Sequence, residues 1–189
     1  MKKTWLWIVI AVLLAGLIIG AYFLYDYLAG QMDTNPTLAD GRTETTGQEQ
    51  TSVQTVPDFT VYDKNGKAYK LSEAFGKPIV LNLWASWCGP CKIEMPGFQE
   101  MYEIYGNDVR FMMVNVTGID TLADAKAFIQ NNGYSFPVYY DTDNSMAANY
   151  YGGSVPVTYF IDSRGQLVTH APGSISAEIL EQGIGMITE

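Results

Sequence analysis

The chain has 189 residues, with 11 lysines and arginines against 20 aspartates and glutamates, and a formal net charge of −9. This length accommodates one domain of ordinary size together with accessory segments. Without Lys2 and Lys3, 9 basic residues face the same 20 acidic ones, which gives the remainder a net charge of −11. This charge argues against nucleic acid or an anionic bilayer surface as a ligand of the main body.

The N-terminus has the pattern of a membrane anchor. Lys2 and Lys3 precede an uncharged stretch, residues 4–25, whose roughly 22 residues could cross a hydrocarbon core of about 30 Å as a helix. Aromatic residues lie at both ends of this stretch, as at the two interfaces of a bilayer: Trp5, Trp7, Tyr22, Phe23 and Tyr25. A cleaved signal peptide is the alternative, but it has a shorter apolar core and a small-x-small cleavage site. We therefore predict a single transmembrane helix over residues 4–25, with residues 1–3 in the cytoplasm.

Residues 26–55 are predicted to form a flexible linker outside the cell membrane. Large apolar residues are scarce after Leu38, and neither helical nor strand periodicity is visible. A coil of about 30 residues has an r.m.s. span on the order of 30 Å. Such a linker would let a folded domain, residues 56–189, meet partners at the membrane surface.

The folded domain is predicted to open with a β-hairpin and a buried strand. Phe59 and Val61 fit the first hairpin strand, Asn65-Gly66 is a two-residue turn signal, and residues 67–71 return. Residues 79–84 follow and are apolar on both faces, as a central strand of a parallel sheet is.

Helices and strands alternate along the rest of the chain. Apolar residues at helical spacing predict a helix from Cys88 to about Gly106, and a buried strand over residues 109–116 comes next. A second helix is predicted to begin at a cap, Asp120 or Thr121, and to end at Asn132-Gly133. The remaining predicted elements are strands at 136–140, 154–161 and 166–171 and helices at 146–151 and 176–186. This order predicts an α/β domain with right-handed crossovers onto one sheet.

The only two cysteines, Cys88 and Cys91, form a C-x-x-C pair directly after the apolar strand. At a helix N-terminus, the Cys88 thiol would face unpaired backbone N–H groups and the positive end of the helix dipole, which stabilise a thiolate. Cys91 lies one turn further along, where it can close a disulfide, and we expect it to be the more buried. Gly89 and Pro90 suit the first turn of such a helix. We predict that Cys88 attacks a disulfide and that Cys91 resolves the mixed disulfide.

A structural zinc pair is the main alternative for the two cysteines. Structural zinc sites usually have four Cys or His ligands, whereas this chain offers only Cys88, Cys91 and His170. We therefore predict no metal, and no cofactor besides the redox-active pair. His170 is expected at the surface of the last strand. Both cysteines belong to this pair, so neither is left for a structural disulfide. In an oxidising compartment, the pair itself would therefore alternate between its disulfide and dithiol forms.

The run W-C-G-P-C after an apolar strand resembles the thioredoxin superfamily. Glu94 and Pro96 extend it to C-x-x-C-x-x-E-x-P, which resembles the membrane-anchored TlpA/ResA-like thiol-disulfide oxidoreductases. Asn82, six residues before the first cysteine, also resembles that branch, since cytoplasmic thioredoxins carry a buried aspartate there. The resemblance covers roughly Val56 to the C-terminus. It implies a thioredoxin-like α/β fold, with a central mixed sheet flanked by helices and an N-terminal hairpin addition.

The resemblance also implies a substrate-binding loop at Pro156. A cis Val155-Pro156 bond would place the Val155 backbone beside Cys88, where it can pair with an extended substrate segment and keep metals from the thiols. An ordinary proline at a strand edge is the alternative. Trp87 is expected to pack over the disulfide and to form the rim that substrates touch, whereas Trp84 is expected in the core.

Glu94 has two possible roles. It lies three residues after Cys91, on the same face of the predicted helix. The resemblance implies a partly buried carboxylate that raises the thiol pKa values and takes the proton from Cys91 during resolution. The alternative is a carboxylate that only complements the helix dipole.

These features together predict an extracytoplasmic protein-disulfide reductase anchored in the cell membrane. Gly89-Pro90 resembles the reducing members of the superfamily, and Glu94 would disfavour the thiolates that make a strong oxidant. The resemblance implies a CcdA/DsbD-like transmembrane thiol carrier as electron donor, and exported protein disulfides such as those of apocytochrome c as substrates. A disulfide isomerase or oxidase is the second hypothesis. A redox-inert binding module or a copper-binding chaperone is a third, although such chaperones have a longer cysteine spacing and a nearby histidine ligand.

Overall fold

The computed structural model describes residues 39–40 and 55–188. The predicted cytoplasmic end (1–3), the predicted anchor (4–25) and most of the predicted linker lie outside the described residues and stay predictions. In the part of the chain that is described, no helix combines the length and the apolar character needed to cross a membrane.

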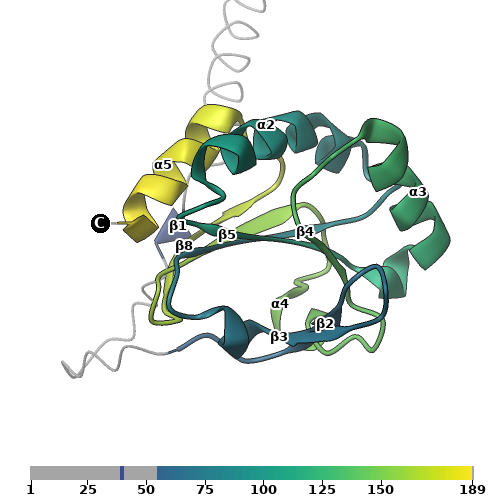
Figure 1. The fold of residues 1–189 in the computed structure, drawn as a ribbon, viewed down its shortest axis with the longest axis horizontal. Helices are drawn as coiled ribbons and strands as arrows, with labels where there is room; N and C mark the ends of the chain where they lie inside the picture. Colours follow the sequence, from purple (N-terminus) through teal and green to yellow (C-terminus); the bar gives the residue numbers. More distant parts are fainter. Residues whose placement is uncertain (1–38, 41–54, 189) are drawn as a thin grey trace, which may run out of the picture. The chain divides into compact units, whose positions relative to one another are not determined.

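A mixed sheet runs through the domain in the order β1-β8-β7-β4-β5-β6-β2-β3 (Figure 1). Its strands are β1 (Ala39–Asp40), β2 (Thr60–Tyr62), β3 (Ala68–Lys70), β4 (Ile79–Trp84), β5 (Arg110–Asn115), β6 (Val138–Tyr140), β7 (Val157–Ile161) and β8 (Leu167–Pro172). Strands β4, β5 and β6 are parallel, while β7 pairs antiparallel with both β4 and β8. The predicted mixed sheet is confirmed.

Strand β4 is central because neighbours cover both its edges and both its faces. All six of its side chains are buried. Its first residue, Ile79, pairs with Arg110 of β5 on one side and with Ile161 of β7 on the other. The position of the C-terminal end of β4 is therefore fixed, and so is the start of the loop that follows it.

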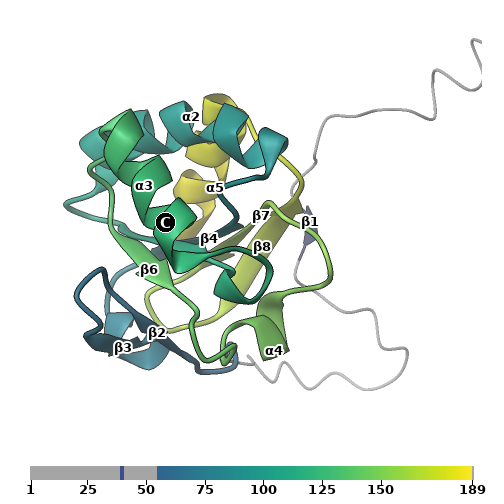
Figure 2. The same ribbon diagram turned by 90° about the vertical axis from the view of Figure 1, so that its right-hand side faces the viewer.

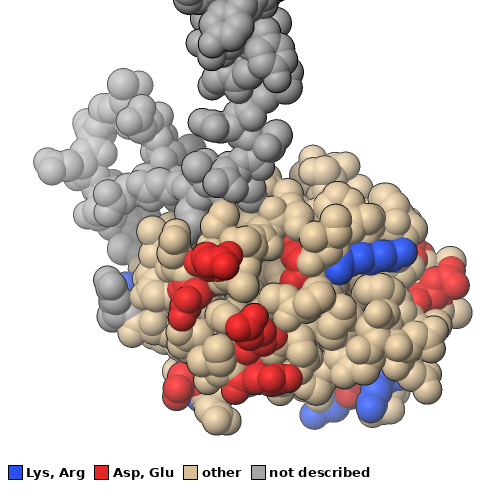
Figure 3. All heavy atoms as spheres, turned by 90° about the horizontal axis from the view of Figure 1, so that it is seen from above, with Lys and Arg blue, Asp and Glu red and all other residues tan. Residues whose placement is uncertain are grey.

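Helices α2 (Gly89–Tyr105), α3 (Leu122–Asn132) and α5 (Ala177–Thr188) cover one face of the sheet, and α2 packs against α5 (Figures 1 and 2). The β2-β3 hairpin, the short helix η1 (Leu71–Ala74) and α4 (Ala147–Tyr150) lie on the other face. One apolar cluster lies under the helices and includes Trp84 and Phe98, and a second lies under the hairpin and includes Val61 and Met112. Acidic side chains are spread over the helical face, as the net charge of −9 leads one to expect (Figure 3).

The helix-capping signals are confirmed with one correction. Thr121 is the N-cap of α3, because its side chain accepts a hydrogen bond from the Asp124 N–H, and Gly133 ends the helix with a positive φ of 69°. Asp120, the other candidate cap, does not cap this helix and binds Ser86 instead.

Strand β1 was not predicted. Ala39 and Asp40 fall inside the predicted linker, and they pair antiparallel with His170 and Thr169 of β8. A strand of two residues is too short to show periodicity in the sequence. It is recognised only from its pairing with the edge of β8.

Candidate active site

The turn from β4 into α2 places the cysteine pair. Cys88 is the N-cap of α2, and its Sγ accepts a hydrogen bond from the Cys91 N–H at 3.1 Å. Pro90 lies in the first turn, where its missing N–H leaves no helical hydrogen bond unmade. Gly89 is exposed, and a Cβ there would have no atom within 4 Å, so the surface next to Cys88 is open. The predicted helix start is confirmed.

Cys88 and Cys91 are joined by a disulfide with a Cα–Cα distance of 5.3 Å. Cys91 is the more buried, but the difference is small, with exposed fractions of 1% and 3%. The first-turn N–H directed at Cys88 therefore distinguishes the two sulfurs better than burial does, because it stabilises negative charge on Cys88 alone.

The loop before β7 lies against Cys88. The Val155-Pro156 peptide bond is cis, as predicted, and the carbonyl oxygen of Val155 lies 3.6 Å from the Cys88 Sγ. A backbone segment at this distance can align an extended peptide alongside the attacking sulfur.

Trp87 is fixed at the surface beside the pair. Its side chain is 60% exposed, and its Nε1 donates a hydrogen bond of 2.7 Å to the carbonyl oxygen of Ile119 in η2 (Thr117–Ile119). This position suits the predicted rim, because an exposed ring held by one bond offers a preformed apolar contact. Trp84, by contrast, is wholly buried, as predicted.

Glu94 is buried below the disulfide-bearing turn, with an exposed fraction of 3%. Its Oε1 accepts a hydrogen bond from Asn82 Nδ2 at 2.9 Å, and its Oε2 accepts one from the Ile175 N–H at 3.1 Å. The first turn of α2 contains no acidic residue, so Glu94 lies too far along the helix to act merely as a complement to the dipole.

Burial raises the pKa of Glu94 to about 8, although the hydrogen bonds from Asn82 and Ile175 oppose the rise. That value is close to the ordinary thiol pKa of about 8.5. A group with this pKa can exchange a proton with a thiol at little cost in free energy, and such a match of pKa values suits general acid–base catalysis.

Asn82 connects Glu94 to the neighbouring strand. Its Nδ2 donates to Thr158 Oγ1 at 3.0 Å as well as to Glu94, while its buried Oδ1 has no hydrogen-bond partner among the residues that the structure describes. The sequence indicated Asn82 only through a family resemblance and gave no sign of Thr158 or of the Ile175 N–H. Those two groups lie 76 and 81 residues from their partners in the network.

Asp120 holds the loop that precedes Cys88. Its carboxylate accepts hydrogen bonds from the Ser86 N–H and hydroxyl, from Asn115 Nδ2 and from the Thr121 N–H. Burial raises the pKa of Asp120, but these hydrogen bonds outweigh it and leave the pKa below its usual value. The carboxylate therefore stays ionised and fixes Ser86 two residues before Cys88.

Replacing Asp120 with alanine is expected to loosen Ser86 and the adjacent Trp87. We expect kcat/KM for a protein disulfide to fall about tenfold, because reacting groups would be less well placed. A small aliphatic disulfide needs no docking surface, so its rate should change less. Asp124→Ala, a nearby exposed change on α3, is the control. Equal losses for both substrates would show that Asp120 does not position the docking surface.

The predicted position of His170 needs a correction. His170 is half-buried rather than at the surface as predicted, and it stacks on Tyr159 with ring centroids 5.8 Å apart. Within residues 55–188, no group of three or more His, Cys, Asp or Glu side chains is arranged to hold a metal ion.

The geometry supports dithiol–disulfide exchange on a thioredoxin-like sheet, and the class of protein is a thiol-disulfide oxidoreductase. A sequence profile described as the AhpC/TSA family matches residues 53–170, which is more than half of the chain. The chain belongs to this thioredoxin-like family.

Individual relatives support the same enzyme class. The thiol-disulfide oxidoreductase ResA of Geobacillus kaustophilus is 35% identical over 143 residues, covering 74% of this chain and 81% of the relative. ResA of Bacillus subtilis is 33% identical over 132 residues, covering 69% and 73%. A crystal structure of a putative thiol:disulfide interchange protein DsbE from Chlorobium tepidum aligns with a TM-score of 0.64 and 29% identity, over 72% of this chain and 96% of that one.

Proposed function

We propose that this chain reduces disulfides of exported proteins from the outer side of the cell membrane. The observation that carries the proposal is the buried Glu94 on the same helix as the Cys88–Cys91 pair. A carboxylate in this place disfavours the thiolates, so the pair gives up its electrons more readily than a strongly oxidising pair does.

The reaction begins with the pair in its dithiol form. The Cys88 thiolate attacks one sulfur of the substrate disulfide, forms a mixed disulfide and releases the other substrate sulfur as a thiolate. Cys91 then loses its proton to Glu94 and attacks the Cys88 Sγ. The second substrate thiolate leaves, two electrons have passed to the substrate, and the Cys88–Cys91 disulfide remains.

The oxidised pair needs two electrons before the next cycle. A CcdA/DsbD-like transmembrane thiol carrier is the electron donor in this proposal, and the redox pair needs no further cofactor. The predicted anchor at 4–25 and the linker at 26–55 would keep the domain near such a carrier. Exported proteins with accessible disulfides are the substrates, and the cysteine pairs of apocytochrome c are one example.

The reduction potential of the Cys88/Cys91 pair tests the direction of this reaction. In the full chain equilibrated with thiol buffers, we expect a value nearer to that of thioredoxin, about −270 mV, than to that of DsbA, about −120 mV. A potential near the DsbA value would contradict the proposal and identify an oxidase, and a value near that of protein disulfide isomerase, about −180 mV, would favour an isomerase.

A further inference from the structure

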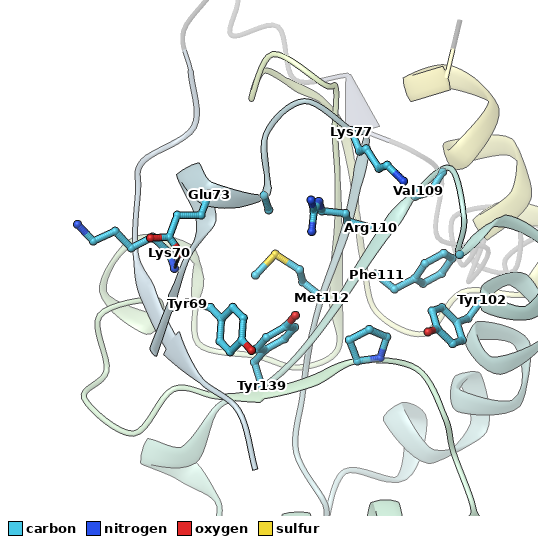
Figure 4. A pocket seen from close by; sticks show the side chains of 13 residues that line it. Tyr69, Lys70, Glu73, Lys77, Tyr102, Val109, Arg110, Phe111, Met112 and Tyr139 are labelled. Atoms are coloured by element: carbon cyan, nitrogen blue, oxygen red, sulfur yellow. Dashed lines mark hydrogen bonds between the residues drawn. The ribbon is translucent and has the colours of Figure 1, made fainter. Parts of the chain in front are cut away.

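A cavity lies at a distance from the cysteines. It has a volume of about 250 Å³ and opens between the hairpin side, with Tyr69 and Glu73, and the sheet side, with Arg110, Met112 and Tyr139 (Figure 4). Arg110 pairs with Ile79 at the start of β4, whereas the cysteines follow the end of that strand. Five strand steps of about 3.3 Å put the two sites roughly 17 Å apart.

The cavity is basic although the chain is acidic. Three of the 11 lysines and arginines line it, Lys70, Lys77 and Arg110, against one of the 20 acidic residues, Glu73. The lining therefore carries a formal charge of +2 in a chain whose net charge is −9. Such a local reversal of sign concentrates anions from solution.

Arg110 is the cation best placed to bind an anion there. Lys77 already donates a 2.6 Å hydrogen bond to the Asn107 carbonyl oxygen, and Figure 4 shows Lys70 turned outward. Arg110 reaches from β5 toward the hairpin, and among the described residues its guanidinium has neither an ion-pair nor a hydrogen-bond partner. A free guanidinium fork matches a carboxylate or a phosphate.

Aromatic rings form the walls. Tyr69 and Tyr139 meet edge to face with centroids 5.3 Å apart, and Tyr102 lies on the opposite side, against Phe111. The hydroxyl groups of these three tyrosines have no hydrogen-bond partner within the described part of the chain. Ordinary ligand pockets measure about 300–1,000 Å³, so this smaller cavity suits a ligand with one ring rather than several.

We infer that this cavity is a binding site for a small anion with a single aromatic ring, with Arg110 holding the anionic group and the tyrosines holding the ring. A ligand bridging Arg110 and Tyr69 would tie the hairpin to the sheet, to which β2 is joined by one residue pair, Tyr62 with Tyr140. The inference is independent of the proposed reductase function.

Calorimetric titration of the full chain with benzoate and with phenyl phosphate tests the inference. We expect at least one of them to bind with a Kd on the order of 1 mM or tighter, and to raise the melting temperature because it binds only the folded state. Arg110→Gln should weaken binding about tenfold or more, since it removes charged hydrogen bonds. Lys64→Gln is the matched control, because it removes a charge from the hairpin turn and not from the cavity lining.

Four results would overturn the inference. Absence of binding by both probes would exclude the site. Equal affinity for phenol would show that the anionic group is not recognised, and equal affinity for inorganic phosphate would show the same for the ring. If Lys64→Gln weakened ligand binding as much as Arg110→Gln does, the effect of Arg110 would be explained by general charge attraction. Unchanged disulfide reduction in Arg110→Gln is expected as well, because the cavity is remote from the cysteines.

Discussion

Replacing Cys91 with serine is expected to stop turnover and to leave Cys88 bound to its substrate in a stable mixed disulfide. The Cys88 Sγ receives the hydrogen bond from the helix N-terminus, so the attacking sulfur is intact in this variant. The resolving thiol is missing, and the second half of the exchange cannot occur. Intact-mass spectrometry after mixing the reduced variant with a disulfide-bonded peptide should show the adduct.

Cys88→Ser is the matched variant and should behave in the opposite way. It removes the nucleophile, so we expect peptide reduction to fall by about 10³-fold or more and no adduct to accumulate. The double variant controls for adducts formed elsewhere, although the chain has no other cysteine. Accumulation of the adduct in Cys88→Ser and not in Cys91→Ser would reverse the assignment of the two sulfurs.

The elements that carry the pair were predictable because their signals are local. Residues 79–84 are apolar on both faces, and the structure makes them a strand buried on both faces. The C-x-x-C spacing with Pro90 in the first turn likewise fixes the start of α2 within one residue of the prediction. Each of these signals spans fewer than about ten residues, so the sequence contains it in full.

The support around the pair was not predictable in the same way. The sequence predicts Asp120 or Thr121 as the cap of α3, because both residue types are favoured at a helix N-terminus. Thr121 is the cap, and the Asp120 carboxylate instead accepts hydrogen bonds from Ser86, 34 residues away. Only the parallel pairing of β4 with β5 brings the ends of those strands together. The same reasoning applies to the cavity, since Tyr69 and Arg110 meet only after the hairpin folds across the sheet.

Glu94→Gln is expected to lower the pKa of the active-site thiols and to slow disulfide reduction. The negative charge that disfavours the thiolates is lost, which lowers the pKa. In the proposed mechanism the proton acceptor for Cys91 is lost as well, and general bases typically contribute about 10²–10⁴-fold to a rate. Titration of the thiols by their absorbance and single-turnover kinetics from pH 6 to pH 10 would measure both effects. An unchanged thiol pKa together with an unchanged rate would leave Glu94 without a catalytic role.

The pH profile separates this role from a structural one. In the parent enzyme the resolution rate should rise as Glu94 loses its proton near its pKa of about 8. The glutamine variant should lack that step, since its side chain does not titrate. Glu100→Gln is the control, because Glu100 is an exposed residue on the same helix. Rotation of the Asn82 amide would let its Oδ1, which has no partner within the described part of the chain, accept a hydrogen bond from the introduced glutamine amide. This bond favours a folded variant.

The free energy of unfolding should depend on pH, and the raised pKa of Glu94 sets the direction of this dependence. The pKa is about 8 in the folded state and near its ordinary value of 4.5 in the unfolded chain. Between these values the folded state holds a proton that the unfolded state has released, so the free energy of unfolding should fall as pH rises, by up to about 1.4 kcal/mol per pH unit. The stabilisation is complete below pH 4.5 and lost above pH 8. Urea unfolding of the oxidised protein should show this slope, and Glu94→Gln should remove most of it. A slope of the same size in the variant would assign the titration to another buried group, such as Asp141, whose pKa burial also raises.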